Sequence, residues 1–368
     1  MERTQAFAWF PLVARPRPAC APLEARVSTL CDLARTADRD NDTSTASTVF
    51  NQAALLASDL DLPTLAREWC HRHATLYLRG CPLPGTAARH ALEPLVNLAR
   101  LQIRAGSGNS AFHLLNGLYE ALKVRTDTVI DGLPMPFSTL ARTADDHQDV
   151  LQWLWRVLLA DGTRALTSAG RWCDALVHLR SRNGVGDRML DGRQVAVIAN
   201  AIAGDTAAAC ALLATTAAGE PWENAVTACL AALCQPGDNR AASEMLDRYR
   251  RLDHAASGLV VFRTRLGLSV VEAIGGARSA EGRAVATTVI IRAVASDDGY
   301  AARDVLTHPA CSGMLQNDQT LALSTTVRAS GLGLQRLPEQ LGADLAAALS
   351  RSELVITRMV PSSSTSGS

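Results

Sequence analysis

The chain has 368 residues, of which 48% are hydrophobic and only 4% aromatic, and its 36 basic residues balance its 36 acidic residues. A formal net charge of zero gives no excess positive potential, so direct binding to nucleic acid or to an anionic membrane is not expected. Lys123 is the only lysine, a bias that we interpret as the signature of a high-G+C bacterial genome. The length exceeds that of one hydrophobic core and predicts several domains or an elongated array.

The first 40 residues are expected to form an N-terminal arm and lead-in, with residues 1–22 extended because several prolines interrupt any helical period. Pro11, Arg15 and Pro16 also break the apolar run, so neither a secretion signal nor a membrane span is expected here. The nine cysteines show no framework of spacings, which favours reduced thiols and a cytoplasmic protein. Residues 356–368 are predicted to be a disordered tail.

Between the two ends, apolar residues recur at helical spacing and are separated by short turns rich in Gly and Pro. This pattern predicts helices at about 44–58, 86–104 and 109–124, and about fourteen helices in the whole chain. We therefore expect an all-α protein. The regular alternation covers residues 41–255, and an irregular helical cap is expected at 256–355.

Four turn segments carry a family resemblance: "AGSGNSAFHLL", "SAGRWCDALVHL", "AGDTAAACALL" and "PGDNRAASEML". Each places Gly at a helix end and a small residue where the next helix would cross the previous one. The chain therefore resembles the tetratricopeptide class of helical-hairpin repeats in a divergent form, because the fuller pattern with Trp and Tyr is absent. The resemblance implies a curved solenoid of antiparallel helix pairs, and HEAT-like pairing is the alternative.

A polar stripe on the helix at 86–104 is the candidate binding surface. It consists of His90, Glu93, Asn97, Arg100 and Arg104. These residues follow one another at spacings of three and four and therefore share one side of the helix. In the tetratricopeptide class the first helix of each pair lines the concave groove, so the resemblance implies contact with a peptide or partner protein. A solvated face with no binding role is the alternative.

The segment "WCHRHATLYLRGC" suggests a metal site at first inspection. Cys70 and His73 share a helix face, and Cys81 follows just beyond the helix, but a structural zinc needs four converging ligands. His90 would have to join them across two prolines. We therefore expect core packing here, with Cys70, His73 and Cys81 as weak candidate ligands only, and we predict no cofactor.

Three other motifs are expected to be structural. Gly106 and Gly108 have the spacing of a dinucleotide-binding loop, but they follow a helix where such a loop follows a strand. Asp145 and Asp146 precede a helix and are expected to cap it, and Asp298 is expected in a turn. The sequence contains no P-loop, nucleophile elbow or HExxH motif.

These observations favour a non-catalytic interaction protein that binds a peptide segment or partner protein on the concave surface of a helical array. One alternative is a sensor or regulatory subunit that binds a small peptide or metabolite, because the chain resembles the sensor part of bacterial regulators without their DNA-binding head. A further alternative is an atypical biosynthetic tailoring enzyme that uses His71, His73 and His90.

Overall fold

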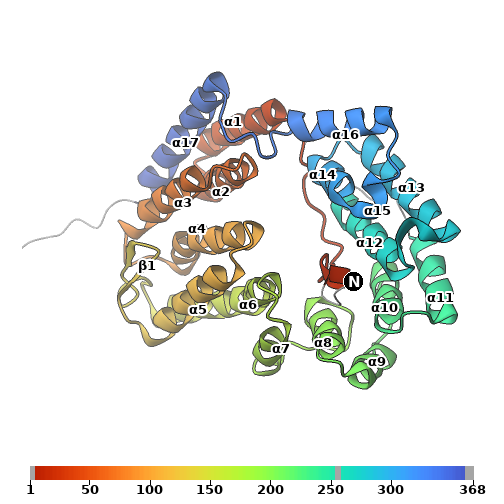
Figure 1. Ribbon diagram of the computed structural model, residues 1–368. Helices are drawn as coiled ribbons and strands as arrows, with labels where there is room; N and C mark the ends of the chain where they lie inside the picture. The colour runs from red at the N-terminus through yellow and green to blue at the C-terminus, as the bar shows by residue number, and fades with distance from the viewer. Residues whose placement is uncertain (1–4, 253–257, 361–368) are drawn as a thin grey trace, which may run out of the picture. The chain divides into compact units, whose positions relative to one another are not determined.

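The structure is a computed structural model that describes residues 5–252 and 258–360. The described residues form seventeen α-helices, two short 3₁₀ helices and one two-stranded hairpin, which confirms the all-α prediction (Figure 1). None of the described helices is long and apolar enough to span a membrane. By its internal contacts the chain divides into unit 1, residues 1–22 and 170–330, and unit 2, residues 23–169 and 331–368.

Unit 2 contains α1 (Leu23–Asp40), α2 (Thr43–Asp59), α3 (Pro63–Leu78), α4 (Gly85–Arg104), α5 (Gly108–Val124), β1 (Thr128–Ile130), β2 (Leu133–Met135), α6 (Ala144–Ser168) and α17 (Glu339–Met359). Consecutive helices contact each other from α1 to α6. In addition, α4 contacts both α2 and α6, so α1, α2, α4 and α6 form one layer of the unit. The helices α17, α3 and α5 form a second layer that packs against the first (Figure 1).

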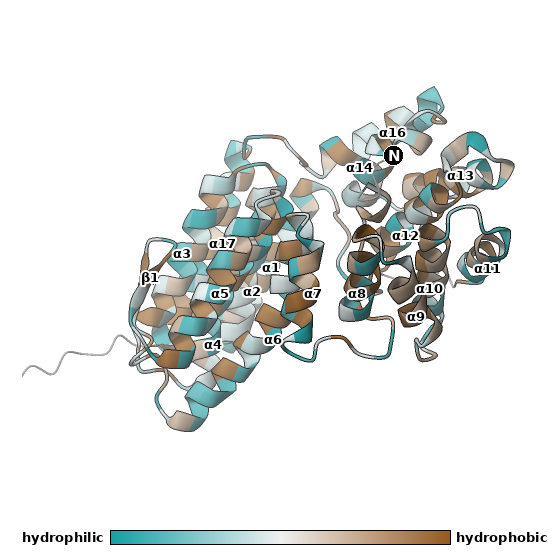
Figure 2. Cartoon of the chain, turned by 60° about the horizontal axis from the view of Figure 1, so that its bottom comes forward, coloured by the Kyte–Doolittle hydropathy of each residue, from teal (hydrophilic) through white to brown (hydrophobic). Residues whose placement is uncertain are grey.

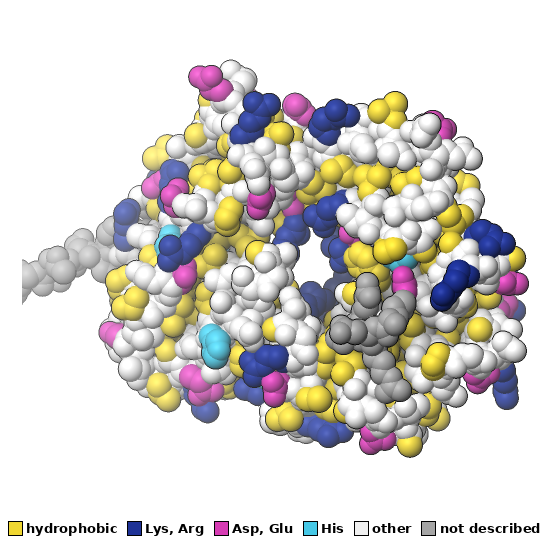
Figure 3. Space-filling view, viewed as in Figure 1, with side chains coloured by type: hydrophobic (Ala, Val, Ile, Leu, Met, Phe, Trp, Pro, Cys, Tyr) yellow, Lys and Arg dark blue, Asp and Glu magenta, His cyan; other side chains and the backbone are white. Residues whose placement is uncertain are grey.

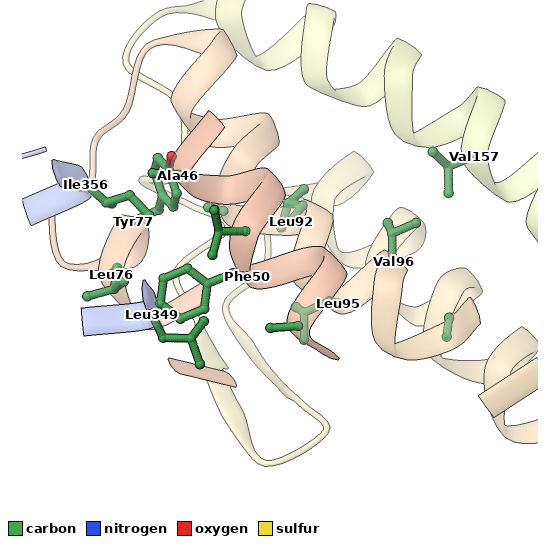
Figure 4. Packing of buried hydrophobic residues seen from close by; sticks show 14 of the residues in the cluster. Ala46, Phe50, Leu76, Tyr77, Leu92, Leu95, Val96, Val157, Leu349 and Ile356 are labelled. Atoms are coloured by element: carbon green, nitrogen blue, oxygen red, sulfur yellow. The ribbon is translucent and has the colours of Figure 1, made fainter. Parts of the chain in front are cut away.

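The last helix of the chain completes unit 2. α17 packs against α1, α2 and α3, although more than 250 residues separate it from them along the chain. Figure 4 shows Leu349 and Ile356 of α17 beside Phe50 and Tyr77, all of which are almost fully buried. Burial of this apolar surface fixes α17 to the start of the unit.

Unit 1 contains η1 (Gln5–Phe7), α7 (Trp172–Arg180), α8 (Asp191–Ile202), α9 (Thr206–Ala214), α10 (Pro221–Cys234), α11 (Asn239–Arg250), α12 (Val260–Ala273), η2 (Gly276–Arg278), α13 (Ala280–Ala295), α14 (Gly299–Thr307), α15 (Pro309–Ser312) and α16 (Asn317–Ala329). Contacts link α8 to α10, α10 to α12 and α12 to α14, which makes these helices one layer. In Figure 2, α10 is mostly brown and α11 is mostly teal, as expected for a central helix beside a solvated one.

The turns that carry the resemblance have the geometry that their glycines predict. Gly106, Gly170, Gly204 and Gly237 all have φ between 74° and 92°, the left-handed region in which glycine ends a helix without steric cost. The chain next begins α5, α7, α9 and α11, respectively. Asp145 and Asp146 lie within the first turn of α6 and do not precede it as expected: the N-cap is Thr143, and Asp146, at the third helical position, completes a capping box with it.

Some local structure differs from the sequence expectations. Part of the expected lead-in is the helix α1, and α17 reaches Met359 because Val355 and Ile356 are buried, so residues 356–359 of the expected tail are helical. Residues 361–368 lie outside the described residues. Residues 128–135, for which no strand was expected, form a hairpin whose turn, Asp131 and Gly132, has φ of 50° and 84°, the Asp-Gly combination typical of tight hairpins.

Candidate functional site

The polar residues predicted on α4 are placed between neighbouring helices of unit 2. His90 and Glu93 are partly buried, with Nδ1 of His90 3.0 Å from the Glu93 carboxylate, which Arg89 also contacts at 3.1 Å. Burial acts to raise the pKa of Glu93, but the contacts with His90 and Arg89 outweigh it and hold that pKa below its ordinary value. Asn97 donates to the carbonyl oxygen of Asn51 on α2 at 3.3 Å.

The two arginines of the stripe pair with buried carboxylates. Arg100 donates to Asp161 of α6 at 2.8 Å, and Arg104 donates to Asp59 at the end of α2. The side chains of Asp161 and Asp59 are only 8% and 1% exposed. Arg100 and Arg104 therefore already have partners within unit 2, and the partner-binding role of His90, Glu93, Asn97, Arg100 and Arg104 stays a prediction.

The weak metal candidates are packed as core residues. Cys70 is buried, and desolvation raises the pKa of its thiol to about 12, while Cys81 is partly buried and its pKa is raised to about 11. His73 is fully buried and stacks on Phe50, with 4.9 Å between ring centroids. Within residues 5–252 and 258–360, no three or more His, Cys, Asp and Glu side chains are grouped so as to hold a metal ion.

The histidines of the enzyme hypothesis are also separated in the structure. His71 points to the hairpin, where its Nε2 lies 2.7 Å from the carboxylate of Asp131, and Arg67 pairs with the same carboxylate. His73 faces the core between Phe50 and Tyr77, and Tyr77 lies between it and His90. The three imidazoles therefore have different environments and do not converge on one cavity.

Unit 1 binds a segment of the chain that has no regular structure of its own. We call residues 8–22, which follow η1, the strap. Pro11, Pro16, Pro18 and Pro22 lack an N–H group and fix φ, so the strap forms neither a helix nor a sheet ladder. Figure 1 shows this segment running beside α12 and α14. Phe10, Leu12 and Cys20 are its most buried side chains, each 5% exposed or less.

Gln194 of α8 binds the main chain of the strap on both sides of one residue. The Leu12 N–H donates to Oε1 of Gln194 at 2.7 Å, and Nε2 of Gln194 donates to the Leu12 carbonyl oxygen at 2.7 Å. The same amide nitrogen donates to the Met189 carbonyl oxygen at 3.1 Å, which fixes the orientation of the side chain. Gln194 is fully buried, so these hydrogen bonds satisfy polar groups that water does not reach.

The start of α14 binds the other end of the strap. The Cys20 N–H donates to Asp298 at 3.0 Å, and the Cys20 carbonyl oxygen accepts from the Gly299 N–H at 3.0 Å. Asp298 also caps α14 by accepting from the N–H groups of Tyr300 and Ala301. One carboxylate therefore caps a helix and binds an extended chain, and the predicted turn residue Asp298 has a second role.

Side-chain contacts add to these main-chain hydrogen bonds. The guanidinium of Arg265 on α12 lies 5.3 Å from the Trp9 ring centroid, and Asp304 holds that guanidinium at 2.7 Å. Arg15 pairs with Asp191 at the start of α8 at 3.0 Å. We call Asp191, Gln194, Gly258, Arg265, Asp298 and Gly299 the strap site; Gly258 takes part because its carbonyl oxygen accepts from the Arg17 N–H at 3.0 Å.

The strap site has the parts that recognition of an extended peptide requires: groups that pair with the peptide main chain, apolar contacts and a charged edge. Sequence reasoning missed Gln194. The signal was the long amide side chain of Gln194 in the largely apolar run "QVAVIANAI", since a buried polar group needs a partner. The acidic and basic side chains are interspersed over the face shown in Figure 3, in agreement with the balanced net charge.

Comparison with known proteins found no match for this chain: no protein-family model, no curated protein and no solved structure matches it.

Proposed function

We propose that this chain is a non-catalytic interaction protein that binds an extended peptide segment of a partner along α8, α12 and α14 of unit 1. The observation that carries the proposal is the strap, an extended segment bound there through both main-chain groups of Leu12 and of Cys20. Main-chain hydrogen bonds give affinity for an extended peptide whatever its side chains are, and the adjoining contacts give selectivity.

The proposal includes the tetratricopeptide-like stacking of helix pairs that the sequence predicts. It is supported by the contacts between consecutive helices in each unit and by the left-handed glycines in the turns. It also places the protein in the cytoplasm, which is supported by nine cysteines that are all free thiols.

The test is whether unit 1 binds an extended peptide supplied from outside. In the full chain, Leu12→Asp places a charge at a buried position of the strap and should release it from its site. A fluorescent synthetic peptide of residues 8–22 is then titrated by fluorescence polarisation. We expect saturable binding to the Leu12→Asp chain, and a loss of about ten-fold or more when Gln194→Leu is added, because two buried hydrogen bonds disappear.

Asn200→Leu is the matched control. Asn200 is another amide of α8, but its Nδ2 donates to the Ala196 carbonyl oxygen of its own helix. We expect this variant to bind the peptide as the Leu12→Asp chain does. Circular dichroism checks that each variant folds, and the milder Leu12→Ala replaces Leu12→Asp if the latter does not. Absence of peptide binding to either folded strap variant, or equal binding with and without Gln194, contradicts the proposed function.

A further inference from the structure

We infer that the strap is a tethered competitor for its own site, and that the partner segment which replaces it is extended, punctuated by proline and basic. This inference rests on the proposed function. The free protein would then keep the strap site covered until such a segment is present. Three features of the strap and its site support this view.

The first feature is that the site binds main-chain atoms. Gln194, Asp298, Gly258 and Gly299 all contact N–H or C=O groups of the strap. A different segment with the same backbone course satisfies the same groups. Proline favours that course because it presets an extended backbone and reduces the entropy lost on binding. Pro16 and Pro18 enclose Arg17, whose N–H makes one of these hydrogen bonds, in the segment of the strap nearest Gly258.

The second feature is the charge at the edge of the site. Arg15 is well exposed, with 62% of its side chain accessible, and it reaches Asp191, of which 19% is accessible. A carboxylate at this position attracts a basic segment and repels an acidic one, so it selects by charge. Arg15 and Arg17 make the middle of the strap basic: Arg15 pairs with Asp191, while Arg17 interacts electrostatically with Asp298 and Asp304 and is opposed by the like charge of Arg265.

The third feature is that the middle of the strap contributes little burial. Residues 15–19 are all exposed, so the side chains that the strap buries, such as Leu12 and Cys20, lie on either side of this part. A cavity of about 470 Å³ lies against this middle part and is lined on one side by strap residues 16–19 and on the other by Gly258, Val260, Val261 and Asp298. Val261 is already buried, but Val260 is only partly buried, so a segment with larger apolar side chains at these positions can bury more of Val260 than the strap does.

The competition is tested by comparing the wild-type chain with the Leu12→Asp chain. The strap of the wild-type protein occupies the site within the same molecule, so an added peptide binds only the fraction of molecules whose site is open. We expect the fluorescent strap peptide to bind wild type about ten-fold or more weakly than Leu12→Asp. Hydrogen exchange of the wild-type strap, followed by mass spectrometry, should increase on addition of saturating unlabelled peptide, because the Leu12 and Cys20 N–H groups lose their acceptors.

The ligand class is tested by charge exchange. A strap peptide with Arg15→Glu and Arg17→Glu should bind the Leu12→Asp chain about ten-fold more weakly than the original peptide. Adding Asp191→Arg to that chain should weaken the original peptide and restore binding of a peptide that carries Arg15→Glu alone. A general loss of structure does not produce this reversal of preference.

The outcomes separate the inference from the proposed function. Equal affinity of wild type and Leu12→Asp for the peptide, with unchanged exchange of the strap, overturns the competition and leaves peptide binding standing. Equal affinity for the basic and acidic peptides overturns the basic ligand class. Failure of every peptide to bind any folded variant overturns the proposed function itself.

Discussion

Replacing Asp59 with Ala should lower the free energy of unfolding of unit 2 by about 3–5 kcal/mol, the cost of removing one partner from a buried ion pair. Asp59 is the last residue of α2, and its side chain is 1% exposed. Its carboxylate accepts from Arg26 of α1 at 2.5 Å and from Arg104 of α4. Without it, the guanidinium groups of Arg26 and Arg104 lose the buried carboxylate that they share where α1, α2 and α4 meet.

Asp38→Ala is the matched control for this prediction. Asp38 also accepts from two arginines, Arg351 and Arg358 of α17, but all three side chains are at least 31% exposed. Water and salt screen such a surface network, so we expect a much smaller loss in the free energy of unfolding. Urea unfolding is followed by hydrogen exchange of fragments from α1, α2 and α4, which reports unit 2 separately. If Asp59→Ala lowers the free energy of unfolding of unit 2 no more than Asp38→Ala does, this result would falsify the structural role of the Asp59 network.

Acid should destabilise unit 2 through His73, and His73→Leu should remove that part of the pH dependence. Burial lowers the pKa of His73 from 6.5 to about 3, so the folded chain keeps this imidazole neutral. The unfolded chain binds a proton below pH 6.5 and the folded chain does not. The contribution of neutral His73 to the free energy of unfolding is therefore fully present above pH 6.5. It is lost as the pH falls towards 3, at about 1.4 kcal/mol per pH unit.

At pH 4 this loss amounts to about 3 kcal/mol relative to pH 7, which makes it the second large effect that we expect. The measurement is a series of urea unfolding curves between pH 4 and pH 7 for wild type and His73→Leu. His113→Leu is the control, because His113 is an exposed histidine of α5. If His73→Leu and wild type lose stability in parallel down to pH 4, then His73 is not the group responsible.

The helices and their turns were largely predictable because they depend on local chemistry. The expected helices at 44–58, 86–104 and 109–124 correspond to α2, α4 and α5 within about one residue at each end. Glycines that follow helices take the left-handed conformation that only glycine adopts freely. The hairpin at residues 128–135 was missed, although Asp131-Gly132 is a typical hairpin turn, because both strands have only three residues.

The stripe on α4 shows where local reasoning ends. Periodicity correctly indicates that Arg100 and Arg104 lie on one side of the helix, but it does not show which groups face that side. In the structure Asp161 and Asp59, separated from them by 61 and 45 residues, supply carboxylates to these arginines. Whether a polar side chain faces solvent or a buried partner is therefore not determined by its own helix.

The sequence by itself determined that this protein is all-α, where the helices α2, α4 and α5 begin and end, and that the proline-rich residues 8–22 form no regular helix, because propensity, capping and proline act within a few residues. Only the tertiary structure decided that α17 packs on α1, that Gln194 binds the main chain of Leu12 and that Asp298 binds that of Cys20. These contacts join residues 182 to more than 300 positions apart. They depend on which buried polar and apolar groups meet when the whole chain packs, and no local pattern encodes that choice.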